Sequence, residues 1–353
     1  MYLDSNAVPA GAFEMKGRAL SCELYGKGHI NETYLVKTDA GRDYILQKIN
    51  NRIFRDVPAL MKNIQAVTAH LRKRESDPRR VLTIVPARGG GSFIEQDGQY
   101  FRVYDFVTGS LSLDAPETVE DFKESAAAFG RFQKQLSYFP AANLSETIPH
   151  FHDTPKRYLA MREAIRQDVM GRAAGVRDEI NFALAREQDA ALLMDKLRAG
   201  LLPLRVTHND TKLNNVLFDS ATRKGLCVID LDTVMPGLCA NDFGDSIRFG
   251  ASTAAEDERD LSRVSMSLEM YRAYRDAFLA ACGDSLRDEE IASLPVGAKL
   301  MTLECGVRFL TDYLSGDTYF RIHREGHNLD RCRTQFKLVE DMEDKWRDMQ
   351  IKP

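Results

Sequence analysis

The sequence predicts an α+β protein with two lobes, a small β-rich lobe followed by a larger, mainly helical one. Two observations predict this division. Short runs of β-branched and aromatic residues between turn signals fill roughly the first hundred residues. After Gly109, apolar residues recur at steps of three and four, which is typical of amphipathic helices. We therefore expect lobes over residues 1–108 and 109–353, joined at Phe106–Ser110.

The first lobe is expected to consist of strands around one helix. Apolar residues at helical steps predict that helix from about Val57 to Arg74. An Asp97–Gly98 pair predicts a tight hairpin between the last two strands. The expected strands are Glu32–Lys37, Asp43–Ile49, Val81–Val85, Ser92–Glu95 and Tyr100–Val107.

The second lobe is expected to be dominated by long helices. Its one β-like interruption is Leu204–Asp232, in which apolar runs flank a polar centre. A largely apolar stretch at Leu300–Leu314 also has a helical pattern. The remaining expected helices are Val119–Leu136, Lys156–Gly171, Ile180–Arg198, Ser262–Ala281 and Asp330–Asp348.

Length and composition exclude several classes of protein. The chain has 353 residues, 44% hydrophobic and 28% charged, which excludes a disordered or collagen-like chain. Its 48 basic and 52 acidic residues argue against a nucleic-acid partner. No apolar stretch approaches the roughly 18–20 residues that span a bilayer, and no export signal is evident. Six widely spaced cysteines indicate reduced thiols, so we expect a cytoplasmic protein without a membrane partner.

The polar centre of Leu204–Asp232 holds the residues that phosphoryl transfer requires. Asn215 follows Asp210 after five residues, and Asp230 follows it after twenty. Phosphoryl transfer needs a carboxylate to orient the acceptor hydroxyl and take its proton, and oxygen ligands for Mg²⁺ at the nucleotide phosphates. A protein-kinase-like site supplies an Asp, an Asn and a second Asp in this order. The alternative is a polar loop beside an acidic strand end.

A second aspartate competes for the metal. Asp242-Phe243-Gly244 spells the tripeptide that holds Mg²⁺ in protein kinases. It lies beyond a Pro-Gly turn, however, whereas Asp230 ends the expected strand, so we assign the metal to Asp230. We expect Asp242 and Asp245 to cap the following helix or to brace the catalytic loop.

The nucleotide is expected to bind at the first lobe. Gly26 and Gly28 lie in a turn ahead of a strand, where glycines allow backbone N–H groups to approach phosphates. A hairpin turn without a ligand is the alternative. The strand ending at Val107 leads into the expected hinge, and its backbone around Asp105–Val107 is placed to pair with an adenine edge.

These segments together resemble the aminoglycoside phosphotransferase/choline kinase superfamily and, more narrowly, the N-acetylhexosamine 1-kinases. The resemblance implies a bilobal protein-kinase-like fold. It also implies transfer of phosphate from ATP, with Mg²⁺, to the anomeric hydroxyl of N-acetylglucosamine or N-acetylgalactosamine, giving the α-1-phosphate. The segments that carry it are THNDTKLNN, IDLDTVMPG, YGKGHIN, YILQKIN, HFHDTPKR, FGDSIRFGAST and ECGVRFLTDYLSGDTYF.

The resemblance also implies roles for individual residues. Asp210 would be the catalytic base at the sugar hydroxyl, and Asn215 and Asp230 the metal ligands. His29 would lie in the phosphate loop. The residues at sugar-pocket positions are Phe249, Arg308 and Tyr319.

Some residues have a second reading. Within a helical, apolar stretch, Arg308 taken alone favours an ion pair with Glu304 or Asp312. His150 and His152 have no third metal ligand nearby, so they are either structural residues or border the acceptor.

One departure from most kinase-like folds concerns a phosphate-binding lysine on the third strand, which normally pairs with a glutamate on the next helix. Here Gln47 takes the lysine position, and strand alternation turns Lys48 to the other face. The expected helix Val57–Arg74 has no acidic residue, so both partners are missing together.

Two other functions fit the generic motif. One is a kinase for a different small hydroxyl compound, such as another hexose, homoserine or an amino alcohol. The other is a non-catalytic relative that binds nucleotide or sugar. The complete set of Asp210, Asn215 and Asp230 favours a catalyst, with ATP and a small sugar as its partners.

Overall fold

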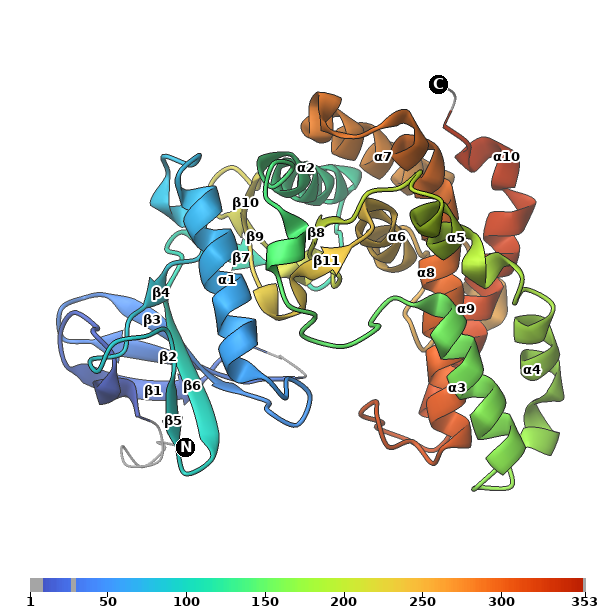
Figure 1. Ribbon diagram of the computed structural model, residues 1–353, viewed down its shortest axis with the longest axis horizontal. Helices are drawn as coiled ribbons and strands as arrows, with labels where there is room; N and C mark the ends of the chain where they lie inside the picture. Colours follow the sequence, from blue (N-terminus) through green and yellow to red (C-terminus); the bar gives the residue numbers. More distant parts are fainter. Residues whose placement is uncertain (1–8, 27–29, 352–353) are drawn as a thin grey trace.

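An antiparallel sheet forms the N-terminal region and helices dominate the C-terminal region, which confirms the predicted fold class (Figure 1). The computed structural model describes residues 9–26 and 30–351, so Gly28 and His29 lie outside the described residues. The division at residue 108 stays a prediction.

The N-terminal sheet has the strand order β1-β2-β3-β6-β4, with β5 paired to β6. The predicted strand Asp43–Ile49 is confirmed, and Asp97 and Gly98 have φ angles of 52° and 71° at the predicted hairpin. The strand β1 was not predicted. The bounds are β1 Ala19–Leu24, β2 Glu32–Thr38, β3 Asp43–Ile49, β4 Ile84–Val85, β5 Ile94–Gln96 and β6 Gln99–Asp105.

Helix α1 (Val57–Arg72) lies beside this sheet, and two small sheets follow it in the chain. One has the order β10-β9-β7 and the other pairs β11 with β8. Strands β8, β9 and β10 lie within the β-like segment predicted from the sequence, β11 follows it, and β7 was not predicted. Their bounds are β7 Ser110–Ser112, β8 Arg205–Thr207, β9 Val216–Asp219, β10 Gly225–Val228 and β11 Met235–Gly237.

The helices of the C-terminal region correspond to the predicted ones with several differences. Their bounds are α2 Val119–Gln135, α3 Thr154–Gln167, α4 Arg177–Leu184, α5 Leu192–Arg198, α6 Cys239–Gly250, α7 Leu268–Cys282, α8 Asp288–Leu314, α9 His327–Asp344 and α10 Trp346–Met349. The single helix predicted at Ile180–Arg198 is wrong. Ion pairs to α3 and α8 hold residues Glu187 and Asp189 between α4 and α5, so the chain leaves the helical path there.

Two other predicted helix bounds are also wrong. Helix α7 begins after Ser267, whose side chain accepts a hydrogen bond from the backbone of Met270 and so caps the helix. Before it, Leu261–Arg263 form a single 3-10 turn, and Met266 forms a bridge with Ser252. The predicted helix Asp330–Asp348 is divided into α9 and α10.

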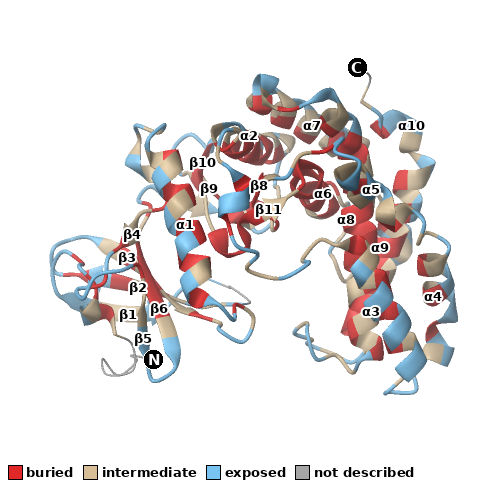
Figure 2. Cartoon of the chain, viewed as in Figure 1, coloured by how far each residue is buried: buried red, intermediate tan, exposed pale blue. Residues whose placement is uncertain are grey.

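The helix α6 was not predicted because nearly all of its residues are buried, which leaves no amphipathic pattern to detect. It packs against α8 at unusually short range. A Cβ atom on Gly244 would lie 2.3 Å from the carbonyl oxygen of Gly297, so only glycine permits this approach. Figure 2 shows the buried residues gathered where these central helices face one another.

A second hydrophobic cluster joins the two regions. It extends from Leu60 of α1 and Tyr104 of β6 to Phe132 of α2 and Leu226 of β10. All six cysteines are free. Among the described residues, no helix combines the length and apolar character needed to cross a membrane.

Candidate active site

The loop after β8 brings Asp210 and Asn215 together. The side-chain amide of Asn215 donates to the backbone carbonyl of Asp210 at 2.7 Å and to its carboxylate at 3.2 Å. The ammonium of Lys212 lies 3.1 Å from the other carboxylate oxygen. Burial would raise the pKa of Asp210, but the charges of Lys212 and His208 outweigh it and hold this pKa below its usual value. Asp210 is therefore a carboxylate at neutral pH.

Asp230 follows β10 and faces the same loop. The backbone N–H of Ile229 donates to the carbonyl of Asn215 at 2.9 Å, and the ring of His208 lies 2.8 Å from the carbonyl of Ile229. The Asp230 side chain is exposed to solvent. Even so, lost hydration and the carboxylates of Asp232 and Asp210 raise its pKa to about 7. The three residues predicted from the sequence are thus brought to one place.

The donor atoms at this place fit a hard divalent cation. Asp230 supplies a carboxylate crowded by like charges, which a cation would relieve. The amide nitrogen of Asn215 is committed to Asp210, so its remaining ligand atom is the amide oxygen. Nowhere among the described residues do three His, Cys, Asp or Glu side chains form a metal-binding group. A site of this kind therefore depends on oxygen ligands from nucleotide and water, as Mg²⁺ sites commonly do.

Asp242 and Asp245 brace the loop from helix α6. The two oxygens of Asp242 accept hydrogen bonds from the backbone N–H groups of His208 and Asn209, at 2.8 and 2.7 Å. Gln133 donates to the same carboxylate, which is 1% exposed. Asp245 accepts from the backbone of Thr211 at 2.9 Å. Of the two expected roles, bracing is therefore the one found.

The nucleotide side of the site is only partly described. Gly26 has a φ of +77° at the start of the turn that is predicted to approach the phosphates. At the hinge, the backbone N–H of Asp105 donates to Thr83, and that of Phe106 donates to Asp43. Within the described residues, the N–H of Val107 has no such partner, which makes it the hinge group open to an adenine edge. That role stays a prediction.

The lysine and glutamine of β3 take the two faces expected from strand alternation. Lys48 lies 3.3 Å from the carboxylate of Glu32. Gln47 turns the other way, donates to Thr33, and accepts two hydrogen bonds from Arg102 of β6. Neither Arg102 nor its carboxylate partner Asp232 was singled out from the sequence. A charged residue within the apolar run FRVYD was the available signal.

The ion pair expected between Arg308 and Glu304 or Asp312 is wrong. Glu304 is bound instead by His152 at 2.9 Å and Thr154 at 2.7 Å. The carboxylate of Asp312 accepts the backbone N–H groups of residues 318–320 at 2.8–2.9 Å. Within the described structure, no carboxylate lies within 4.0 Å of the Arg308 guanidinium.

Aromatic rings surround Arg308 instead. Its guanidinium carbon lies 5.3 Å from the ring centre of Phe151, 5.8 Å from that of Tyr319 and 5.4 Å from that of Phe320. Tyr319 is 59% exposed, so this group of aromatic rings around Arg308 is open to solvent on the side of Tyr319. A second cation, Arg157 of α3, is close enough for the charge of Arg308 to act on it, and its Nε is buried without a hydrogen bond. Arg157 lies within HFHDTPKR but was not singled out.

The other residues predicted near the acceptor, Phe249, His150 and His152, lie in different surroundings. Phe249 is half-buried near the end of α6, four residues after Asp245. His152 lies between the site and α8, with its Nε2 3.1 Å from the carbonyl oxygen of Asn209. His150 is largely exposed, 4.0 Å from Asp153. His152 is thus the structural residue of the pair and also borders the catalytic loop.

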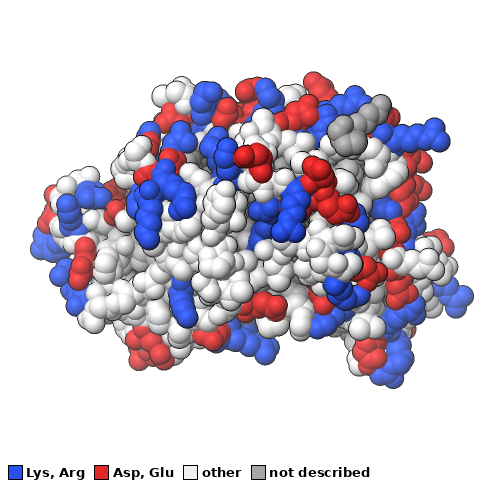
Figure 3. Space-filling view, turned by 45° about the horizontal axis from the view of Figure 1, so that its top comes forward, with Lys and Arg blue, Asp and Glu red and all other residues white. Residues whose placement is uncertain are grey.

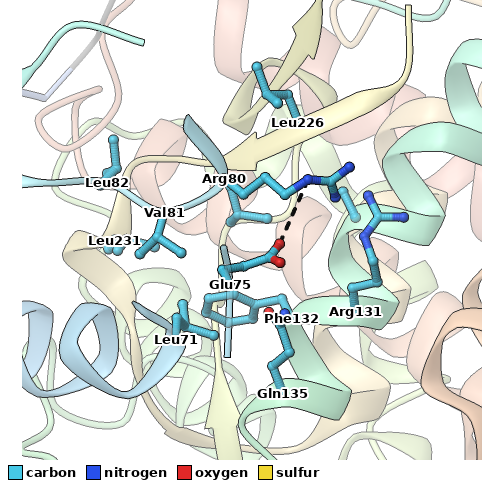
Figure 4. A pocket seen from close by; sticks show the side chains of 12 residues that line it. Leu71, Glu75, Arg80, Val81, Leu82, Arg131, Phe132, Gln135, Leu226 and Leu231 are labelled. Atoms are coloured by element: carbon cyan, nitrogen blue, oxygen red, sulfur yellow. Dashed lines mark ion pairs between the residues drawn. The ribbon is translucent and has the colours of Figure 1, made fainter. Parts of the chain in front are cut away.

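A separate pocket, with an empty volume of about 430 Å³, lies between the α1–β4 connection and α2 (Figure 4). Glu75 and Arg80 form an ion pair there at 3.7 Å, beside Arg131. None of the predicted site residues lines it. On the face in Figure 3, basic and acidic side chains are intermixed.

Comparison with known proteins places this geometry in a family. Residues 21–277 match the phosphotransferase enzyme family. An aminoglycoside phosphotransferase from Alicyclobacillus acidocaldarius has a similar structure, with a TM-score of 0.66, 14% identity, and coverage of 99% of this chain and 96% of that chain. A microcompartment-associated aminopropanol kinase has a TM-score of 0.64 and 18% identity, and the match covers 97% of each chain. An amicoumacin kinase, solved with AMP-PNP and Ca²⁺, has a TM-score of 0.62 and 15% identity, and the match covers 98% of this chain and 94% of that chain. These structures share the fold.

Proposed function

This chain belongs to the phosphotransferase enzyme family, and we propose that it transfers phosphate from ATP to the anomeric hydroxyl of an N-acetylhexosamine, giving the α-1-phosphate. The observation that carries the proposal is the meeting of Asp210, Asn215 and Asp230 at one place, in a chain that also holds a half-buried arginine, Arg308, for which the described residues provide no ion pair. The choice of sugar is supported by the resemblance of segments such as FGDSIRFGAST to the N-acetylhexosamine 1-kinases.

Asp210 is the proposed catalytic base. Its lowered pKa keeps it ionised, so that it can orient the acceptor hydroxyl and receive its proton. The hydrogen bond from Asn215 and the ion pair with Lys212 fix the carboxylate before any substrate arrives. Orientation of this kind is a major part of catalysis in phosphoryl transfer.

Asn215 and Asp230 are the proposed ligands of Mg²⁺ bound with the nucleotide. When bound, this ion neutralises charge on the phosphate oxygens of the donor. On the chain's side, Gly26, together with Gly28 and His29 in the resemblance, would bring backbone donors to those phosphates. Asp105 and Val107 would hold the adenine through the hinge backbone.

The acceptor is proposed to lie against Arg308, Tyr319 and Phe249. Two arginines that form no ion pair among the described residues, Arg157 and Arg308, bring positive charge to this side of the site, next to the single buried carboxylate of Glu304 that acts on both. Such a site disfavours a cationic acceptor by like-charge repulsion. It favours a neutral acceptor rich in oxygen atoms, because guanidinium N–H groups can donate to hydroxyl and acetamide oxygens.

The second candidate is a kinase for another small hydroxyl compound. A neutral hexose without the acetamide group satisfies the same electrostatic requirement, whereas aminopropanol and other amino alcohols do not. A non-catalytic sugar or nucleotide sensor would need no proton acceptor at Asp210.

A panel of acceptors tests the proposal. N-acetylglucosamine, N-acetylgalactosamine, glucose, galactose, homoserine and ethanolamine would each be supplied with ATP and Mg²⁺, and release of ADP would be measured. We expect the two N-acetylhexosamines to be the best acceptors and the amino alcohol to be the poorest. Preference for ethanolamine would contradict the acceptor assignment. Absence of turnover with every acceptor, despite nucleotide binding, would favour the sensor.

A further inference from the structure

A buried ion pair connects the N-terminal sheet to the segment that carries Asp230. Arg102 of β6 and Asp232 have side chains that are only 1% and 3% exposed. The guanidinium forms a two-point contact with the carboxylate, in which Nη1 meets Oδ1 and Nη2 meets Oδ2. Such fork-to-fork pairing fixes orientation as well as distance.

Every donor of Arg102 is already occupied. Besides Asp232, its Nε and Nη2 donate to the side-chain oxygen of Gln47 at 3.0 and 2.8 Å, and Nη1 donates to the sulfur of Met61 at 3.8 Å. No N–H group is therefore left for a phosphate. Arg102 lies on the face of the sheet where kinase-like folds have a phosphate-binding lysine. Its contacts, however, are with other side chains of the protein, so its role is structural support and not phosphate binding.

Asp232 is also bound by Asn31, which follows the proposed phosphate loop. The amide of Asn31 donates to the Asp232 carboxylate at 2.5 Å, and the oxygen of Asn31 accepts the backbone N–H of Asn50 at the end of β3. The backbone carbonyl of Asp232 accepts the hydroxyl of Thr147 at 2.9 Å. Asp232 is thus a junction between the sheet, the phosphate loop and the helical region.

Helix α1 also contacts the Asp230–Val234 segment, through an uncharged side chain. The amide of Asn63, itself 1% exposed, donates to the carbonyl of Val234 at 3.0 Å and to that of Ser145 at 2.8 Å. In kinase-like folds the corresponding helix contributes a glutamate to the strand lysine. Here the helix and the sheet both hold the Asp230–Val234 segment directly.

We propose that Arg102 and Asp232 are positioning residues, whose ion pair holds the adjacent Asp230 where it binds the metal of the metal–nucleotide complex. Stability does not explain the pair, because a buried ion pair is generally no more stable than apolar residues of similar volume. Its geometry instead fixes a backbone turn: Asp230 has a left-handed φ of 58°, and the next residues form one helical turn that contains Asp232. The inference rests on the proposed role of Asp230 as a metal ligand.

Binding of AMP-PNP, with and without Mg²⁺, tests this inference by calorimetry and needs no acceptor. The variants are Arg102→Met, Asp232→Asn and the double variant R102M/D232L, which removes both charges together. We expect each to weaken Mg²⁺-dependent binding by about 10–100-fold, the usual effect of losing a partner that orients a metal ligand. Binding of metal-free AMP-PNP should change by less than about 3-fold.

The double variant and a remote control separate positioning from folding. The double variant leaves no buried charge unpaired, so it should unfold near the wild-type temperature and still bind Mg²⁺-nucleotide weakly. Arg186→Met breaks a two-point pair with Glu343 in the helical region and should change stability only.

Three results would overturn the inference. Recovery of both stability and Mg²⁺-dependent binding in the double variant would mean a purely structural pair. Loss of binding in Asp232→Asn with normal binding in Arg102→Met would make Asp232 a metal ligand itself. Absence of Mg²⁺-dependent binding in the wild type would overturn the proposed function together with the inference, whereas wrong acceptor specificity would leave the inference intact.

Discussion

The metal side and the acceptor side of the candidate site differ in how completely their polar groups are paired. On the metal side, Asp242, Asp232 and Arg102 are buried and each accepts or donates several hydrogen bonds. On the acceptor side, Arg308 meets aromatic rings without an ion pair, and the Nε of Arg157 is buried without an acceptor. The residues proposed for phosphoryl transfer are held by other groups of the chain, whereas the proposed acceptor side keeps a buried N–H group without a partner.

The difference has a physical reason. Asn209 and Asp230 have left-handed backbone angles, with φ of 64° and 58°, and such residues cost free energy unless their surroundings hold them. Hydrogen bonds with Thr207, Asp242 and Thr233 provide that restraint for Asn209. For Asp230 it comes from its neighbours, because Ile229 is bonded to Asn215 and Asp232 to Arg102. Unpaired buried donors, by contrast, are unfavourable until something binds them. The Nε of Arg157 is such a donor on the proposed acceptor side.

The largest effect is expected from Asp210→Asn. The change removes the proton acceptor and keeps the shape of the side chain, so kcat should fall by about 10²–10⁴-fold, the usual contribution of a general base. Steady-state kinetics would measure this fall, while AMP-PNP binding should stay close to that of the wild type. A variant that keeps more than about a tenth of wild-type kcat would contradict the base role.

Asp230→Ala and Asp242→Ala compare a proposed ligand with a brace on the same side of the site. Asp230→Ala should raise the Mg²⁺ concentration for half-maximal rate by at least about 10-fold. Asp242→Ala should instead lower the free energy of unfolding by about 1–3 kcal/mol or more, because it strands buried N–H groups of His208 and Asn209. Mg²⁺ titration and urea unfolding distinguish them. The reverse pattern would move the metal to Asp242.

Arg308→Lys sharpens the contrast on the acceptor side. Lysine keeps the charge but not the planar set of donors, so kcat/KM for the sugar should fall at least ~10-fold, since hydrogen bonds to charged groups contribute about 1.5–3 kcal/mol. The KM for ATP should barely change. A lower melting temperature with unchanged sugar kinetics would mean that Arg308 is structural.

The smallest effect is expected from Asp312→Asn. Its carboxylate accepts three consecutive backbone N–H groups, including that of Tyr319, and the amide of Asn328. Asparagine presents an NH₂ group to those donors, so the loop should loosen at a cost of about 1–3 kcal/mol. We expect a moderate rise in the KM for the sugar and no change for ATP. An equal effect on both substrates would contradict a local role on the acceptor side.

The fold could be predicted where local pattern and tertiary structure agree. The strand Asp43–Ile49 and the start of helix α1 follow from a β-rich run beside a turn and from the helical spacing of apolar residues. The break between α4 and α5 could not be predicted, because residues there pair with α3 and α8, which lie elsewhere in the sequence. Nor could α6, whose burial on all sides removes the helical pattern.

Some residues of the candidate site could likewise be predicted from the sequence, and others could not. Asp210, Asn215 and Asp230 were found because their spacing along the chain reflects the chemistry. The Arg102–Asp232 pair joins residues 130 positions apart, and no local spacing marks it. Arg308 was weighed against two nearby carboxylates because sequence distance suggested them, but both are occupied by other donors.

The position of the phosphate on the product tests the central claim most directly. The protein would be incubated with ATP, Mg²⁺ and either N-acetylglucosamine or N-acetylgalactosamine, and the product examined by phosphorus NMR with coupling to the sugar protons. Our account predicts a single phosphate ester at C1 with the α configuration. A 6-phosphate, or no phosphorylated product from either sugar, would contradict it.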